Sequence, residues 1–245
     1  MSDPYRESAE FLDIMSRDNW RVIGPRLDKA LAPVDPSTGP VVDLGAGTGL
    51  GTLTIAAALP GAEILAVEPS PGLRAVLLSR VYDDADLARR VTVLDTDAQH
   101  ADLPERLAAV VAMNMIGHLD RGERRTLWAS LARRLAPSGR IVVNLQPPAD
   151  PVSLPDTRFC AIPIGRRSYE GWGRAEPTGP DSVTWHMRYR LTEAGVPIRE
   201  RTVDYPWWIL TESALRAETA EAGLTTEPFG RTEERLYVIC KQPTP

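Results

Sequence analysis

Residues 41–51 read VVDLGAGTGLG, an apolar run that ends in an aspartate and four alternating glycines. The short β-branched run predicts a buried strand, and residues 50–59 predict a helix that ends at Pro60-Gly61. Glycine permits positive φ angles and lets a ligand approach the backbone with no Cβ in the way. A glycine loop between a strand and a helix is where doubly wound α/β sheets bind nucleotides.

The spacing of the glycines excludes two common nucleotide loops. No Gly-Lys-Ser/Thr follows, so the loop is not a phosphate-binding P-loop. The dinucleotide fingerprint Gly-x-Gly-x-x-Gly also fails, because counting from Gly45 and Gly47 places its third glycine at Leu50. An NAD-dependent dehydrogenase is therefore the least favoured function.

Strand and helix signals alternate after this loop. Apolar runs without polar alternation, separated by helical stretches, predict parallel strands that are covered on both faces of a doubly wound sheet. Ser70-Pro71 is a typical helix start, and Asp120 with Glu123 resembles a capping box. Further strands are expected at 64–67, 91–94, 109–113, 141–145 and 236–241, and further helices at 120–136 and 211–222.

Composition excludes several classes of protein. Hydrophobic residues make up 43% of the 245 residues and charged residues 25%, which is typical of a globular protein. Cys160 and Cys240 form neither a disulfide framework nor a metal cluster, so no metal site is expected. No apolar run approaches the roughly 20 residues of a membrane-spanning helix, and the start shows no secretory pattern. With a net charge of −5, we expect a cytoplasmic protein without nucleic-acid or membrane partners.

Proline and tryptophan mark an insertion in this regular pattern. Seven of the 22 prolines lie between residues 146 and 181, and four of the six tryptophans lie between residues 172 and 208. Within this region, 183–191 and 198–205 are expected to form two strands joined by Glu193-Ala194-Gly195.

At the glycine loop the chain resembles the class I S-adenosylmethionine-dependent methyltransferases of the small-molecule, natural-product type. Residues 43–49 match the first motif of that family position by position. Glu68 matches the position that holds the ribose hydroxyls, and Asp97-Ala98 matches the position beside the adenine amino group. Residues 113–119 resemble the segment after the fourth strand of the family. The resemblance implies S-adenosyl-L-methionine as the cofactor, bound by Asp43, Gly45, Ala46, Gly47, Gly49, Glu68, Pro69, Asp97, Ala98 and Asn114.

The same resemblance implies a fold and a division of the chain. The expected fold is α/β, a doubly wound, mostly parallel seven-stranded sheet (Rossmann-like) with an antiparallel cap over the active site. The N-terminal helices, with Tyr5, Phe11 and Trp20, are expected to close over the cofactor. The predicted parts are an N-terminal helical lid at 1–35, a cofactor-binding core at 36–146, a cap for the substrate at 147–206, and a C-terminal completion of the core at 207–245.

Two histidines are candidate catalytic residues. His118 follows the fourth strand, at the carboxyl edge where reacting groups gather, and is the first candidate for a general base. An ordinary hydrogen-bonded loop histidine is the alternative for this residue. His186 is the second candidate, and strand alternation puts it on the face opposite Trp185 and Tyr189.

The aromatic side chains of the insertion offer a stacking surface for a planar or apolar substrate. Their packing into a hydrophobic core is the alternative. The wider aromatic set includes Trp172, Tyr205 and Trp208. The predicted substrate-binding residues are Trp20, Trp185, Tyr189 and Trp207.

The sequence thus predicts an S-adenosylmethionine-dependent O- or N-methyltransferase that acts on a small metabolite of secondary metabolism. One alternative is the same fold using its bound cofactor for a cyclisation or decarboxylation, and another is a non-catalytic cofactor-binding protein. A nucleic-acid methyltransferase is disfavoured, because residues 114–117 read NMIG where such enzymes carry Asn/Asp-Pro-Pro-Tyr/Phe. The small-molecule substrate is the expected partner, and a homodimer is left open.

Overall fold

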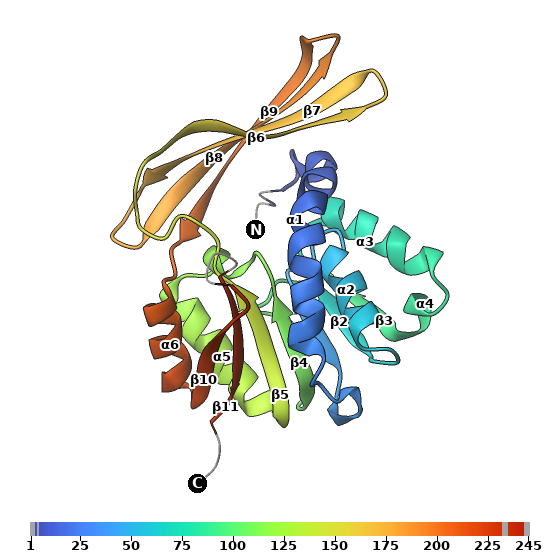
Figure 1. Cartoon of the computed structure of the whole chain (residues 1–245), viewed down its shortest axis with the longest axis vertical. Helices are drawn as coiled ribbons and strands as arrows, with labels where there is room; N and C mark the ends of the chain where they lie inside the picture. The colour runs from blue at the N-terminus through green and yellow to red at the C-terminus, as the bar shows by residue number, and fades with distance from the viewer. Residues whose placement is uncertain (1–2, 4, 232–234, 243–245) are drawn as a thin grey trace.

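The computed structural model describes residue 3 and residues 5–231 and 235–242. Residues 1, 2 and 4 of the predicted lid, and 232–234 and 243–245 of the predicted C-terminal part, lie outside this description. A seven-stranded sheet forms the lower body of the molecule in Figure 1. Its strands are β1 (Val41–Leu44), β2 (Ile64–Val67), β3 (Val91–Leu94), β4 (Leu107–Ala112), β5 (Leu135–Asn144), β10 (Leu224–Phe229) and β11 (Leu236–Lys241).

The order of the strands confirms the predicted doubly wound fold. They run β10-β11-β5-β4-β1-β2-β3, and all neighbours are parallel except β11, which is antiparallel to both β5 and β10. The chain leaves β1 toward β2 on one side and returns to β4 on the other. The carboxyl ends of β1 and β4 therefore flank the crevice where open α/β sheets bind their ligands.

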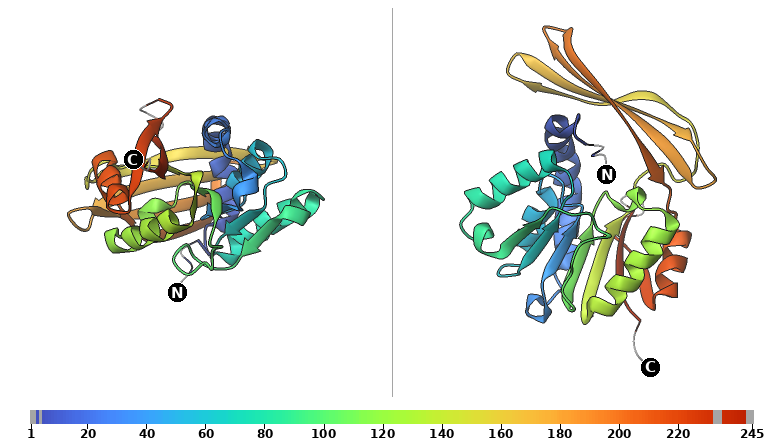
Figure 2. Two further views of the ribbon diagram at one scale, coloured as in Figure 1. Left: turned by 90° about the horizontal axis from the view of Figure 1, so that it is seen from below. Right: turned by 180° about the vertical axis from the view of Figure 1, so that it is seen from behind.

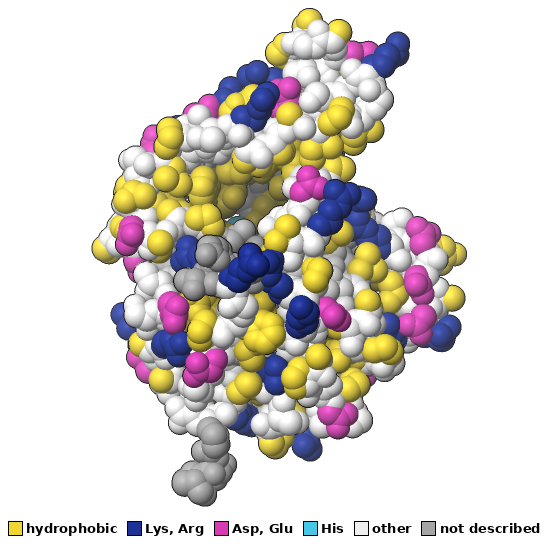
Figure 3. Space-filling model, viewed as in Figure 1, with side chains coloured by type: hydrophobic (Ala, Val, Ile, Leu, Met, Phe, Trp, Pro, Cys, Tyr) yellow, Lys and Arg dark blue, Asp and Glu magenta, His cyan; other side chains and the backbone are white. Residues whose placement is uncertain are grey.

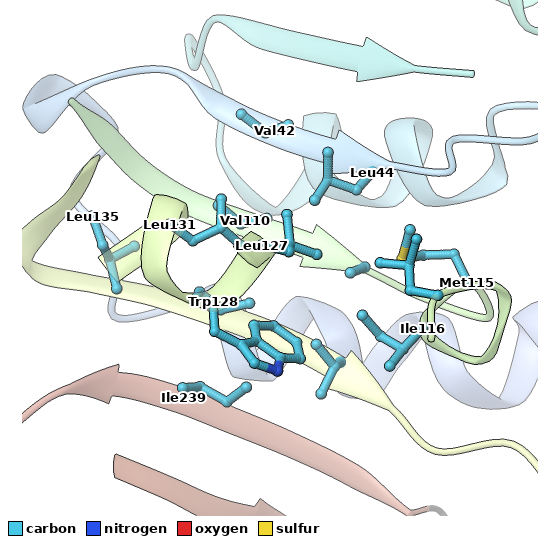
Figure 4. Packing of buried hydrophobic residues seen from close by; sticks show 14 of the residues in the cluster. Val42, Leu44, Val110, Met115, Ile116, Leu127, Trp128, Leu131, Leu135 and Ile239 are labelled. Carbon is cyan, nitrogen blue, oxygen red and sulfur yellow. The ribbon is translucent and has the colours of Figure 1, made fainter. Parts of the chain in front are cut away.

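Helices cover both faces of the sheet, as Figure 2 shows from behind. Their apolar sides form two hydrophobic clusters, one under α1, α2 and α3 and the other under α5 and α6. Trp128 is the largest fully buried side chain and lies in the second cluster between α5 and the sheet (Figure 4). The helices are α1 (Ala9–Leu31), α2 (Leu50–Ala58), α3 (Pro71–Asp83), α4 (Leu87–Arg90), α5 (Arg121–Arg134) and α6 (Glu212–Glu221), with 3-10 turns η1 (Pro36–Thr38) and η2 (Ile116–His118).

A second sheet stands above the carboxyl edge of the first and forms the cap (Figure 1). It is antiparallel, as predicted, but has four strands rather than two or three, because the sequence analysis placed only the last two. Three prolines and two glycines interrupt their apolar pattern and so hide the strand signal. The cap strands, in order, are β6 (Leu154–Ile164), β7 (Arg167–Pro177), β8 (Ser182–Glu193) and β9 (Val196–Trp208).

Several element boundaries differ from the expectations. The N-terminal part is one helix of 23 residues, α1, with Pro25 inside it. The capping box of Asp120 and Glu123 is confirmed, but α5 ends at Arg134 and residues 135–139 already belong to β5. The short helix α4 and the edge strand β10 were not predicted. Within the described residues, no helix has both the length and the apolar character to cross a membrane.

A buried ion pair joins α5 to α6. The guanidinium of Arg124 donates two hydrogen bonds of 2.8 and 2.9 Å to the carboxylate of Glu218, and both residues are buried. Nη1 of Arg124 donates a third bond, of 2.8 Å, to the carbonyl of Leu119. The pair therefore also fixes the segment that follows β4.

Glu218→Ala is expected to lower the free energy of unfolding by about 3–5 kcal/mol, because it leaves Arg124 charged and buried without its partner. Urea unfolding followed by circular dichroism measures the change. The matched control is Asp18→Ala, which breaks the Arg21–Asp18 pair, whose side chains are 77% and 81% exposed. Water screens that pair, so the control should change little. Equal losses in the two variants would contradict the role given to the buried pair.

Candidate active site

The loop between β1 and α2 has a conformation that glycine adopts without strain. Gly45, Gly47 and Gly49 have φ angles of 70°, 57° and 92°, in the left-handed region. A Cβ on Gly45 would lie 2.9 Å from Cβ of Met115, and one on Gly49 would lie 2.7 Å from Cδ1 of Leu77. A Cβ on Gly47 would meet no atom nearer than 3.9 Å. The loop is thus packed at its two ends and open to a ligand at Gly47.

Glu68 joins this loop to the turn between β2 and α3. Its Oε2 accepts a hydrogen bond of 2.8 Å from the N–H of Gly47, and its Oε1 accepts one of 2.8 Å from the N–H of Ser70. The side chain is buried, and burial raises the pKa of its carboxyl although both N–H donors act in the opposite direction. Each carboxylate oxygen keeps acceptor capacity. Glu68 can therefore shape the loop and still accept hydroxyl donors from a ligand.

Asp43 lies beneath the loop rather than in the open space. It is buried, and its Oδ2 accepts a hydrogen bond of 2.7 Å from the hydroxyl of Thr52. Burial raises the pKa of its carboxyl to about 7, against the effect of the Thr52 hydroxyl. A Cβ on Gly51 would lie 3.1 Å from both the carboxylate and the ring of Trp20. Trp20, a predicted substrate-binding residue on α1, therefore lies near Asp43, and its role in binding a substrate stays untested.

Asp97 and Ala98 follow β3 at the same edge of the sheet. Oδ1 of Asp97 accepts hydrogen bonds of 3.0 Å from the N–H groups of Gln99 and His100, and lies 2.7 Å from the imidazole Nδ1 of His100. These bonds form an Asx-type turn that orders the loop. Ala98 packs against the cluster under α5. Pro69 follows Glu68, and its carbonyl accepts a bond from Arg74.

Asn114 lies in the turn two residues after the end of β4 and has a φ angle of 59°. The N–H of Asn114 donates to Oδ1 of Asn144 at 2.7 Å, and Nδ2 of Asn144 donates to Oδ1 of Asn114 at 2.7 Å. This reciprocal pair fixes the left-handed turn between β4 and η2. The sequence analysis missed Asn144, although a polar residue at the carboxyl end of an apolar strand was the available signal.

His118 lies among three aromatic rings that come from different parts of the chain. Its Nε2 is 2.5 Å from the hydroxyl of Tyr5, at the N-terminus. Its ring centroid is 5.6 Å from that of Tyr205 and 4.9 Å from that of Trp207, both on β9. Burial lowers the pKa of His118 to about 4. The imidazole is therefore neutral at neutral pH.

A cleft of about 410 Å³ lies between the inner face of the cap and the core. Figure 3 shows a hollow there, walled mainly by hydrophobic side chains. Trp185 and Trp207, two of the predicted substrate-binding residues, line it, and their binding of a substrate stays a prediction. The full lining is Gln146, Pro147, Leu154, Pro155, Thr157, Phe159, Gly173, Trp185, Met187, Tyr205 and Trp207.

In β8, His186 lies on the face opposite Trp185, as strand alternation predicted. Because Trp185 lines the cleft, His186 points away from it. His186 lies on the outer face, where its Nδ1 is 2.9 Å from the carboxylate of Asp204. Its position gives no support to a catalytic role. Trp172 lies on the same outer face, under the guanidinium groups of Arg188 and Arg190. It therefore does not contribute to the stacking surface expected of the cap.

Tyr189 points inward but contacts the N-terminal helix instead of lining the cleft. Its ring stacks on that of Phe11 at a centroid distance of 5.3 Å, and it is buried. Its prediction as a substrate-binding residue stays untested. The contact holds α1 against the cap.

A second cavity, of about 540 Å³, opens between α1 and the ends of β4 and β5. Asn114 and Asn144 line it, together with Arg26 of α1 and with Arg231 and Arg235 between β10 and β11. Gln146 and Pro147 line both cavities, so the two are neighbours. Among the described residues, no group of three or more His, Cys, Asp or Glu side chains is placed to hold a metal ion.

The geometry fits S-adenosylmethionine. The open space at Gly47 accommodates a ligand close to the backbone, and Glu68 adds a carboxylate suited to paired hydroxyls. Asp97 and Asn114 follow the neighbouring strands at the same edge. When bound, this cofactor supplies an electrophilic methyl group, and the surrounding residues orient it and exclude water.

Comparison with known proteins agrees with this geometry. A family model described as a methyltransferase domain matches residues 41–139. These residues span β1 to the start of β5 and so contain the glycine loop, Glu68 and His118. No curated protein sequence matches the chain.

Solved structures resemble the whole chain, cap included. DesVI of Streptomyces venezuelae has a TM-score of 0.77 at 18% identity, with 99% of this chain and 100% of that chain covered. S-adenosylmethionine-bound CalS10, an amino pentose methyltransferase from Micromonospora echinaspora, has a TM-score of 0.70 at 21% identity, with 92% and 91% covered. The glycopeptide N-methyltransferase MtfA with S-adenosylmethionine has a TM-score of 0.55 at 22% identity, with 89% and 94% covered.

The matched domain and the fold are those of an S-adenosylmethionine-dependent methyltransferase. Residues 41–139 are its methyltransferase domain, and the four-stranded cap completes an architecture shared with DesVI and CalS10.

Gly47→Leu is expected to abolish binding of S-adenosylmethionine, because the added side chain fills the open space over the loop. Isothermal calorimetry measures the binding. Gly61→Leu is the matched control, since Gly61 also has a positive φ, of 80°, and no atom near its absent Cβ. Both variants should lose about 1–2 kcal/mol of stability through backbone strain. If both still bind equally well, the cofactor does not approach Gly47.

Asp43 is expected to make stability fall as the pH rises from about 4 to about 7. The folded protein holds a proton on this carboxyl with a pKa of about 7, against an ordinary value of 3.8, so proton loss favours unfolding across this range. Asp43→Asn removes the titration. The unfolding free energy of the wild type should therefore fall relative to that of the variant as the pH rises toward 7, as urea titrations at several pH values would measure. Asp86→Asn is the exposed control, with a side chain that is 55% exposed. It keeps Asp43, so the difference in unfolding free energy between the wild type and this variant should stay nearly constant from pH 4 to 7. A difference that changes as much as that for Asp43→Asn would contradict the assignment.

Proposed function

We propose that the protein transfers a methyl group to an amino group of a small metabolite held in the cleft beneath the cap. Held by the glycine loop and Glu68, S-adenosylmethionine would supply the methyl group. The acceptor nitrogen would form the N–CH₃ bond as the methyl–sulfur bond breaks to leave S-adenosylhomocysteine, and the nitrogen would then lose a proton. The observation that carries the proposal is the apolar cleft of about 410 Å³, whose Trp207 touches His118 at the carboxyl edge of the sheet.

The state of His118 favours an amine over a hydroxyl as the acceptor. A pKa of about 4 makes this imidazole a weak base. A phenol holds its proton with a pKa near 10 and must lose it to become a good nucleophile, which such a base assists poorly. A neutral amine attacks without prior loss of a proton. Orientation by the cleft and the aromatic rings is then the main contribution of the protein.

The neighbouring structures support the same choice of acceptor. CalS10 is described as an amino pentose methyltransferase of calicheamicin biosynthesis, and KedS8 as a sugar N-methyltransferase. MtfA is described as a glycopeptide N-methyltransferase. By analogy, we place this protein in a natural-product pathway and take amino sugars and their glycosides as the first acceptors to test. O-methylation of a hydroxylated metabolite is the second choice.

The decisive experiment incubates the protein with methyl-labelled S-adenosylmethionine and a panel of amino sugars, amino glycosides and phenols. Product masses and the position of the label then give the acceptor atom. A product that forms only with cofactor present but carries no label would instead support a cyclisation or decarboxylation. Binding without any product across the panel would support a non-catalytic cofactor-binding protein.

His118→Ala is expected to lower turnover of an amine acceptor by less than about 10²-fold, the lower end of the general-base range, because a neutral amine attacks without prior loss of a proton and the imidazole is a weak base. Affinity for S-adenosylhomocysteine, measured by calorimetry, should barely change. His100→Ala is the control, since that imidazole is 67% exposed and bonded to its own loop. Full turnover in His118→Ala together with its loss in His186→Ala would place the proton acceptor on the cap instead.

A further inference from the structure

Trp207 occupies a position where the cap, the core and the cleft meet. It lies near the end of β9, lines the cleft and is buried. Its ring meets that of His118 edge to face, at 4.9 Å and an interplanar angle of 79°. The indole therefore lies between part of the cleft and His118, and Tyr205, which also lines the cleft, is the second ring beside His118, at 5.6 Å.

Gly117 is the residue on which the indole rests. A Cβ at this position would lie 2.0, 2.2 and 2.5 Å from Cε2, Cζ2 and Cδ2 of Trp207, distances that real Cβ atoms do not reach. Gly117 lies in η2, and its φ is outside the left-handed region. Its backbone would accept any side chain. The indole is thus the reason that this position needs a glycine.

The segment beneath the indole cannot easily move aside. Arg124 donates to the carbonyl of Leu119, directly after η2, and Glu218 holds Arg124 in turn. At the other end, the paired amides of Asn114 and Asn144 fix the start of the segment. A side chain at residue 117 would therefore displace Trp207 rather than the backbone.

We propose that Trp207 determines the size of the acceptor that the cleft admits beside His118, and that Gly117 is the positioning residue that seats its indole. The inference rests on the proposed function, because it assigns the cleft to the acceptor. It goes further by naming the residues that limit the acceptor.

The first test reads the environment of His118 by NMR titration of its imidazole. Gly117→Ala should push the indole away, expose the ring and raise the pKa of His118 from about 4 toward its ordinary 6.5. Trp207→Leu should also raise it. Adding Gly117→Ala in that background should change nothing more, because the fused-ring atoms are gone. Gly24→Ala is the control, since its Cβ would lie 3.6 Å from the nearest atom, an ordinary contact.

The second test compares two amines of different size, benzylamine and 1-naphthylmethylamine, by calorimetry with S-adenosylhomocysteine bound. Trp207→Leu should shift the affinity ratio about tenfold toward the larger amine, because it enlarges the cleft beside His118. Affinity for S-adenosylhomocysteine should be unchanged, since the glycine loop and Glu68 are untouched.

An unchanged pKa of His118 in a folded Gly117→Ala protein would overturn the seating role, and an unchanged affinity ratio would overturn the size limit. If Gly117→Ala does not fold, an unchanged pKa of His118 in Trp207→Leu overturns the seating role in its place. Neither measurement needs turnover. A failure of the labelling experiment would therefore count against the proposed function alone, and these two results would still decide the inference.

Discussion

Two loops of this protein meet at one carboxylate. The register of the parallel strands places Leu44 beside Val67, so the chain leaves β1 and β2 at the same level. The N–H groups of Gly47 and Ser70 then converge on Glu68. Hydrogen bonds to a charged group contribute roughly 1.5–3 kcal/mol each. They offset part of the cost of burying the Glu68 carboxylate, whose pKa burial still raises. The glycine loop keeps its open shape because the N–H of Gly47 is hydrogen-bonded to Glu68. The rest of the candidate site lies around this loop.

Much of this arrangement could be predicted from the sequence because its signals are local. Buried parallel strands appear as short apolar runs in the sequence. The glycines at 45, 47 and 49 have the positive φ angles that the turn after β1 requires. The capping box of α5 is contained in four residues. The sequence analysis therefore placed the parallel strands of the core sheet correctly, and it placed Glu68 directly after β2.

The unpredicted features depend on partners that are distant in the sequence. Tyr5 meets His118 across 113 positions, and Asn114 meets Asn144 across 30. No pattern within a window of one helix or strand reports such pairs. The face that a cap strand presents to the core is also a tertiary property. Alternation separated His186 from Trp185 correctly, but only packing decides which face looks inward.

The cap also has a consequence for how such an enzyme can change over evolution. Its strands pair with one another and not with the core sheet, and they enter after β5 and leave before α6. Figure 1 shows the resulting separation into two bodies. The sequence and length of such a segment can change, or the whole segment can be exchanged, while the register of the core strands stays the same. Selection for a new acceptor can therefore act on the cap, while the cofactor machinery is inherited unaltered.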